Sequence, residues 1–382
     1  MKKLLTFLLS NEISLVFRVD RLFMKKHIIF ILICILLFQT QKSNAQTLPQ
    51  RFGISVYSPG LAVNDDSEFK LFQLNLIYGR AIGLIGLNLG LANYSEKYSI
   101  GLTTGLGNQN DGYSGGLTAG LFFSESLNGL GGISIGGFSN TNKSSEHGNS
   151  IAGLTLGGLM NDIYNPESSS YGMAVGGLRN RIVGSYYGIS LGGGYNSFED
   201  AVGLNIAGIY NKAEKSLVGL SLSAGGNASS DYMSGLAMAI FVNAATNEFN
   251  GVAIAAFLNT AKNFNGVSLT GVVGGADESF NGVSISGIFT GGKELNGFAL
   301  APYTEFAQNN GGTVGIINIA QISTNFQLGG YNHSGGNSGV QIGLVNFSNK
   351  SALLQIGVIN IALDNPIPFL PIVNFNPYGE SD

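Results

Sequence analysis

A short unit that begins with glycine repeats along most of this 382-residue chain. Successive glycines are 15 or 16 residues apart, except for two intervals of 21 and 19, and a tighter series spaced by 14 follows. Each unit is too small to bury a core alone, so a repeat of this period predicts stacked units that share one continuous core. The anchor positions are Gly86, Gly101, Gly116, Gly132, Gly153, Gly172, Gly188, Gly203, Gly219, Gly235, Gly251, Gly266, Gly282 and Gly297, and then Gly311, Asn325, Gly339 and Leu353.

Large apolar and small residues alternate after each anchor. In the unit that starts at Gly251, Val252 and Ile254 alternate with alanines. The first position after the anchor is apolar in all fourteen units of the first series, and the second is always Ala, Ser, Thr or Asn. A period of two is the pattern of a β-strand with two different faces, and no helical period runs through these columns. The sequence therefore predicts an all-β fold.

An asparagine closes the strand in most units. It stands eight places after the anchor in eight successive units and seven places after it in the tighter series. Asn accepts unusual backbone angles and bonds nearby backbone, so we expect it at a corner, where stacked amides can bond from coil to coil. The alternative is a row of ligand-binding amides. The twelve positions are Asn140, Asn161, Asn180, Asn196, Asn211, Asn227, Asn243, Asn259, Asn318, Asn332, Asn346 and Asn360.

The segment that returns to the next anchor has an apolar column of its own. Alanine stands ten places after several anchors, and Leu or Phe stands one or two places before the next. Such a column is what the opposite wall of a thin core would need. The alanines are Ala213, Ala245, Ala261 and Ala276, and the larger residues are Leu217, Phe249, Phe264, Phe280 and Leu295.

Two architectures can use these strands, and we expect a parallel β-solenoid or β-roll of tandem 14–16-residue repeats. The alternative is an antiparallel outer-membrane β-barrel of about 20 strands, in which alternate turns face opposite sides of the membrane. Odd and even units do not differ in that way. Pro366, Pro368 and Pro371 also mark the last segment, and a proline cannot donate to the ladder that would close a barrel.

The ends of the chain differ from the repeats. Residues 24–45 have a basic start, an apolar run and a small-residue cleavage site, which is typical of a signal peptide. Residues 1–23 then represent an upstream extension. We expect residues 46–85 to form an N-terminal cap with strands at 52–57 and 69–78, residues 86–363 the repeat array, and residues 364–382 a proline-rich C-terminal cap.

Composition excludes several classes of function. The single cysteine, Cys34, lies in the predicted signal peptide, so the mature chain would have no thiol chemistry. Residues 46–382 hold 12 basic and 21 acidic residues, a net charge of −9, which disfavours binding to nucleic acid. The sequence predicts no nucleic-acid partner.

No catalytic motif, cofactor motif or metal-binding cluster is recognisable, so we expect no enzyme, no cofactor and no metal. His147 and His333 are far apart in the sequence. The carboxylate pairs Glu199–Asp200 and Asp277–Glu278 are typical of solvated turns, and the turn at 108–112 is the most calcium-like. The long turns after Asn140 and Asn161 are candidate recognition loops, but neutral surface variation is the favoured explanation.

The units Gly203–Asn211 and Gly339–Asn346 resemble a family of surface-repeat proteins from Gram-negative bacteria. That family has tandem Gly-φ-Gln/Asn-φ-Gly/Ala-Gly-φ-φ-Asn units, where φ is an apolar residue, behind a signal peptide, and a closing segment like Leu370–Phe375. The middle units depart from it, because they carry Ser or Ala where Gln is typical. The resemblance implies association with the cell surface or outer membrane, and it carries no catalytic residues.

Together these observations predict a non-enzymatic, exported surface protein that presents an extended β face for adhesion or structural contact. Its ligand would be an unidentified glycan or protein on a surface. An integral outer-membrane barrel, acting as a pore or surface antigen, is the alternative. An exported polysaccharide-processing enzyme is a third hypothesis, and it needs carboxylates from several coils to converge in one cleft.

Overall fold

The computed structural model describes residues 52–57, 70–144 and 150–376. The expected upstream extension and signal peptide, His147 and part of the long turn after Asn140 lie outside these residues. All of the described residues belong to one compact unit of the chain, and it contains all of the β structure described below.

The described residues form strands and turns without a helix, so the all-β prediction is confirmed. Strands β2 and β18 continue through more than one unit. The strands are β1 Phe52–Tyr57, β2 Lys70–Asn110, β3 Tyr113–Ser126, β4 Leu130–Gly136, β5 Ser139–Lys143, β6 Ile151–Gly157, β7 Met160–Gly176, β8 Arg179–Gly192, β9 Tyr195–Ala207, β10 Tyr210–Ser223, β11 Gly226–Ser229, β12 Tyr232–Ala239, β13 Val242–Ala245, β14 Glu248–Ala255, β15 Leu258–Thr270, β16 Val273–Ser286, β17 Phe289–Leu300, β18 Tyr303–Ser334, β19 Ser338–Ser348, β20 Ala352–Ala362 and β21 Phe369–Phe375.

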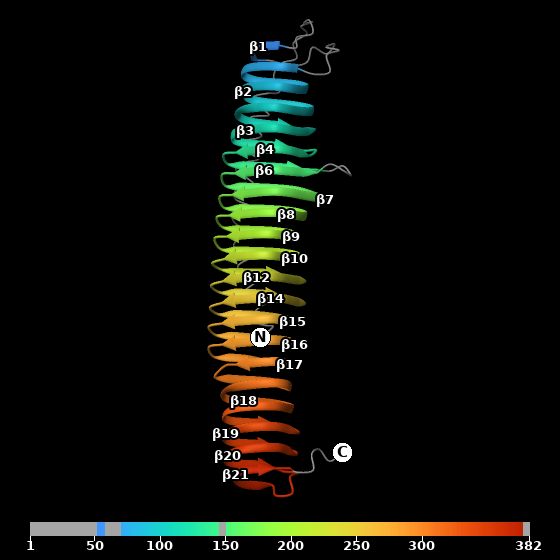
Figure 1. Cartoon of the computed structure of the whole chain (residues 1–382). Helices are drawn as coiled ribbons and strands as arrows, with labels where there is room; N and C mark the ends of the chain where they lie inside the picture. Colours follow the sequence, from blue (N-terminus) through green and yellow to red (C-terminus); the bar gives the residue numbers. More distant parts are fainter. Residues whose placement is uncertain (1–51, 58–69, 145–149, 377–382) are drawn as a thin grey trace. The chain divides into compact units, whose positions relative to one another are not determined.

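Successive units stack as parallel coils (Figure 1). Each anchor pairs with the next anchor, so that Gly235 lies beside Gly251 and Gly251 beside Gly266. The stack is a β-solenoid of about 18 turns, as expected from the repeat. The alternative of an antiparallel barrel is wrong for this chain, because strands from neighbouring units run in the same direction.

One coil has two strands of unequal length. In the coil that starts at β12, this strand forms the long wall, and residues 240–241 make the first corner. The short wall is β13, and residues 246–247 make the second turn before β14 begins the next coil. We use the names long wall, first corner, short wall and second turn for the equivalent parts of every coil.

The anchors must be glycine for two reasons. All fourteen anchors of the first series have a positive φ, between 91° and 156°, a region that side chains strongly disfavour. A Cβ on Gly251 would also lie 2.1 Å from the carbonyl oxygen of Gly235 in the preceding coil. None of the four tighter anchors has a positive φ, which explains why Asn325 and Leu353 can stand there.

The core is a thin layer in which small residues of the long wall face inward. Ala253 and Ser268, two places after their anchors, are fully buried. The aromatic column before the anchors is also buried, and the ring centroids of Phe249 and Phe264 are 4.7 Å apart. Ala261 faces the core from the short wall. The narrow interior has room for large side chains only at the aromatic column. The larger aliphatic residues elsewhere on the long wall therefore point outward.

The two ends of the array pair differently. At the N-terminal end, β1 pairs in parallel with residues 72–78 of β2, and β2 begins at Lys70. At the C-terminal end, β21 turns back and pairs antiparallel with β20, with Phe375 beside Leu354. The proline-marked segment thus adds a last strand that runs against the direction of the coils.

We predict that Gly251→Ala destabilises the protein by more than about 2 kcal/mol, because the substitution combines a strained φ with a backbone clash. Gly312→Ala is the matched control. A Cβ at Gly312 would have ordinary contacts, the nearest at 3.4 Å, and its φ is not in the strained region. Chemical denaturation measures both variants, and equal losses of unfolding free energy would contradict this account of the anchors.

Candidate functional site

The predicted asparagines form a buried ladder along the inside of the solenoid. The amide nitrogen of Asn227 donates to the side-chain oxygen of Asn243 at 2.8 Å, and that of Asn243 donates to Asn259 at 2.9 Å. The same bond joins each successive pair from Asn140 to Asn259 and from Asn318 to Asn360, with distances between 2.7 and 3.2 Å. All twelve side chains are at most 1 % exposed.

The backbone of these residues is not that of a tight corner. Among the described residues, the only residue other than glycine with a positive φ is Ile372, so the asparagines have ordinary extended backbone. Asn227 and Asn243 each follow the first residue of a short wall and point inward. Because their amides bond one another and are closed off from solvent, they hold coils together and offer no surface to a ligand.

The ladder has one interruption of three coils. Gly274, Thr290 and Thr304 occupy the column between Asn259 and Asn318. Before the interruption, the Asn259 amide donates to the Ala253 carbonyl at 2.8 Å. After it, the Thr304 hydroxyl donates to the side-chain oxygen of Asn318 at 2.8 Å. The terminal amides are therefore satisfied by neighbouring groups.

A second ladder was missed by reasoning from the sequence. Gln341 donates to the side-chain oxygen of Gln327 at 2.8 Å, Gln355 donates to Gln341 at 2.7 Å, and all three are fully buried. The sequence feature that could have revealed this ladder is a glutamine two places after three of the tighter anchors. In the other units this position holds a small residue or a short polar one. These coils therefore bury two parallel rows of amides.

We predict that Asn227→Ala destabilises the protein by about 2–3 kcal/mol, because it leaves the buried Asn211 amide and the Asn243 oxygen with one partner fewer. The control is Asn281→Ala. Asn281 makes a similar bond to Asn265, at 2.7 Å, but is exposed to water, so its loss should cost less than about 0.5 kcal/mol. A similar cost for both variants in denaturation experiments would refute a special role for the buried ladder.

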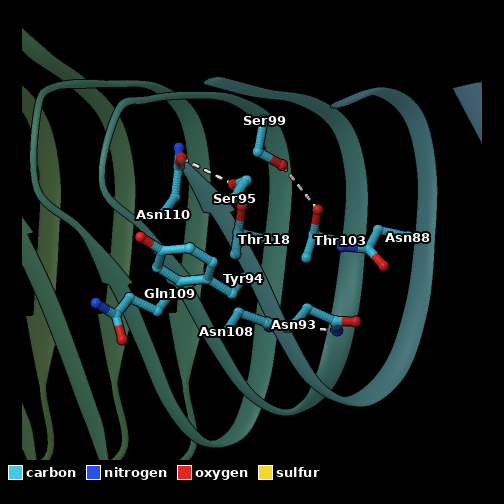
Figure 2. A pocket seen from close by; sticks show the side chains of 10 residues that line it. All are labelled: Asn88, Asn93, Tyr94, Ser95, Ser99, Thr103, Asn108, Gln109, Asn110 and Thr118. Carbon is cyan, nitrogen blue, oxygen red and sulfur yellow. Dashed lines mark hydrogen bonds between the residues drawn. The ribbon is translucent and has the colours of Figure 1, made fainter. Parts of the chain in front are cut away.

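Polar side chains of the first described coils line a small pocket (Figure 2). Its volume is about 10 Å³, close to the room needed by one water molecule. Asn93 donates to Asn108 at 2.8 Å, and Ser95 donates to Asn110 at 2.8 Å. Such a space is too small for a substrate or cofactor. It is lined by Asn88, Asn93, Tyr94, Ser95, Ser99, Thr103, Asn108, Gln109, Asn110 and Thr118.

Three of the four carboxylates singled out in the sequence, Glu199, Asp200 and Glu278, pair with a lysine of a neighbouring coil near the second turn. Lys215 lies 2.7 Å from Glu199 and 3.9 Å from Asp200, and the bond to Lys215 holds the pKa of Glu199 below its usual value. Glu278 lies 3.5 Å from Lys262. No group of three or more His, Cys, Asp or Glu residues that could hold a metal ion occurs in the described part of the chain.

The calcium-like turn at 108–112 uses its oxygen atoms within the protein. The Asp111 carboxylate accepts bonds from the Tyr94 hydroxyl at 2.5 Å and the Gln109 amide at 3.0 Å. Asn110 accepts from Ser95 and from the backbone of Gly112. The long turn after Asn161 lies within β7 and leaves residues 166–167 exposed.

His333 lies in a stack of rings on the short wall. Its ring centroid is 6.3 Å from that of Tyr331 and 5.3 Å from that of Phe347 in the next coil. Burial lowers the pKa of His333 below its usual value of about 6.5. The folded protein therefore holds this imidazole in its neutral form at physiological pH.

We predict that acidification removes stability through His333. The unfolded chain binds a proton as the pH falls through about 6.5, whereas the folded chain binds it only at a lower pH, so the loss begins near 6.5 and ends below the folded pKa. His333→Phe matches Phe347 in the same column and removes this proton. The drop in Tm between pH 7.5 and 5.5 should be smaller in the variant, and an identical drop would disprove the assignment.

Charge is separated between the two sides of every coil. From Gly86 to Ile359, no Lys, Arg, Asp or Glu occurs between two residues before an anchor and six residues after it. Those positions form the first corner and all of the long wall except its first residue. The charged residues of this part of the chain lie on the short wall, at the second turn or at the first residue of the long wall, as Lys212, Glu214 and Glu248 do. The coils therefore have a charged edge, which we define as the short wall with the second turn, and an uncharged side.

The uncharged side ends in a row of exposed apolar side chains at the first corner, which we call the apolar ridge. Ile209 is 59 % exposed and Phe257 49 %, although both are large apolar residues. Phe241 and Phe257 stack with ring centroids 5.2 Å apart. The ridge consists of Leu91, Leu106, Leu121, Phe138, Leu178, Ile209, Ile240, Phe241, Phe257, Ile288, Ile316, Leu344 and Val358.

The charged edge and the apolar ridge are thus the two surfaces that could carry a function. No helix in the part of the chain that the structure describes has the length and hydropathy needed to cross a membrane. Comparison with models of protein families, with curated proteins and with solved structures gave no match.

Proposed function

We propose that this protein is a non-enzymatic, exported surface protein that presents an extended β face for adhesion or structural contact. The observation that carries the proposal is the outer surface of the solenoid, where equivalent side chains stand in columns over about 18 turns. A regular column offers many copies of one weak contact, and such contacts add up through multivalency. Repeat arrays use extended surfaces of this kind for binding.

The charged edge is the face proposed for the ligand. On its short wall, Arg179 and Arg181 belong to one coil, and Tyr195 and Lys212 belong to the next two coils. Arg and Tyr are enriched in protein interfaces because they combine contact area with hydrogen bonding. Arg179 also pairs with Asp162 of the preceding coil at 2.9 Å, which fixes its position. A glycan or protein on another surface is the proposed ligand class.

The proposal of a non-enzymatic role is supported by how the titratable groups are used. Glu199, Lys215, Lys262 and Glu278 form pairs between coils on an exposed edge, where ion pairs contribute little and are solvated. An active site would instead gather such groups in a cleft and shift their pKa values strongly. No cofactor is part of the proposed function.

Export is supported by the signal-peptide pattern of residues 24–45 and by the resemblance to surface-repeat proteins. The test uses intact Gram-negative cells that express the full chain. We predict that a membrane-impermeant, amine-reactive reagent labels Lys215 and Lys262, whose side chains are 61 % and 46 % exposed. Labelling of a periplasmic marker protein in the same cells would reveal leakage and serves as the control.

The same cells are then tested for binding to immobilised glycans and matrix proteins. Deleting the gene should abolish this binding, and replacing Arg179, Arg181 and Lys212 with Ala should reduce it at least tenfold. Protection of both lysines from the reagent, together with no binding by intact cells, would refute the proposed function.

A further inference from the structure

The apolar ridge is a long, convex and uncharged surface, and we ask which partner could cover it. Large apolar side chains exposed at the same corner of many coils are unusual for a soluble protein and mark a site of contact with protein or membrane. The ridge residues Ile316, Leu344 and Val358 are each at least 64 % exposed, so the ridge continues into the tighter coils. We propose that the ridge lies in the apolar layer of a lipid membrane, with the coil axis parallel to the membrane plane.

The inverted distribution of polarity supports lipid as the occupant. Besides the aromatic column and its alanines, the interior holds many buried Asn, Gln, Ser and Thr side chains, whereas other Leu, Ile and Phe residues project outward from the long wall and the first corner. Ile189 and Ile285 of the long wall, which are 39 % and 40 % exposed, extend the apolar surface next to the ridge. The charged edge lies on the other side of each coil. This arrangement is that of an amphipathic element at a membrane interface, repeated once per coil.

The backbone at the ridge is compatible with an apolar layer. Unpaired N–H and C=O groups are too costly in hydrocarbon, so a lipid-facing corner must satisfy them within the protein. The N–H of Ile209 donates to the Gly194 carbonyl at 2.7 Å, and the Ile209 carbonyl accepts from Gly225 at 2.7 Å. In the same way the N–H of Ala256 donates to Ile240 at 2.9 Å. These bonds run between coils at the corner itself.

The shape of the ridge disfavours a second copy of this chain as its partner. A two-fold interface requires a self-complementary surface. The most exposed side chains stand on a bend, so two ridges facing each other would meet along a line and leave their flanks open. A fluid lipid layer instead adapts to a convex row and covers both flanks.

The inference rests on the proposed surface location, but its test uses purified full-length protein and phosphatidylcholine vesicles, without cells or glycans. In a Cys34→Ala background, Phe257→Cys on the ridge and Lys262→Cys on the charged edge each receive an environment-sensitive fluorophore. We expect spin-labelled lipid to quench the probe at 257 at least threefold more than the probe at 262. A failure here would leave cell-surface labelling and glycan binding unaffected, so the two proposals are tested separately.

A lysine variant shows whether the ridge itself makes the contact. Ile209→Lys with Phe241→Lys should lower vesicle-dependent quenching at position 257 about tenfold, because charge is costly in the apolar layer. Thr246→Lys with Asn247→Lys adds the same charge at the exposed second turn and should leave quenching unchanged. Circular dichroism verifies that both variants stay folded.

Two results would overturn the proposal. One is equal quenching at positions 257 and 262, which includes the case in which residues 28–38 alone hold the chain on the vesicle. The other is a blue shift of the probe at 257 that grows with protein concentration in the absence of vesicles, which would identify a second copy as the occupant.

Discussion

In-register pairing between parallel coils is the constraint on which the rest of this structure depends. It places every side chain about 4.8 Å from its counterpart in the next coil, so one choice of residue is repeated as a column. At Phe249 the column becomes a stack of rings, and at Asn227 it becomes a chain of amide bonds. The close approach that makes this pairing possible at the anchors excludes a Cβ, and this explains the glycine at Gly251. The glycine repeat in the sequence is a consequence of that close contact between coils.

Much of the fold could be predicted because columns are visible in a sequence. The alternation after Gly251 indicated strands, and the recurrence in single units indicated parallel coils, which the structure confirms. The stacking partners of Phe249 were also implied, since a fixed period assigns each residue its neighbour. Pairing of equivalent residues is the one long-range contact that periodicity alone provides.

Other features required three dimensions. A period of two separates the faces of a strand but does not say which face is inside, and the narrow interior decided that Ala253 is buried and Ile285 partly exposed. The extended backbone at Asn227 replaced the expected corner, because the bend lies before the asparagine. The apolar ridge was equally hidden, since Ile209 and Phe257 look like core residues until the direction of their side chains is known.

The reversed direction of β21 bears on how long such a stack can become. Parallel coils that repeat one hydrogen-bond pattern form a template on which further strands could be added, as in fibrils. β21 pairs antiparallel with β20 and contains Pro371, which has no N–H to donate. A further parallel coil added at this end would not find the hydrogen-bond pattern that a parallel neighbour offers. The coils are ordered internally like a fibril. The reversed strand limits the length of their stack, and this limit is encoded in the sequence.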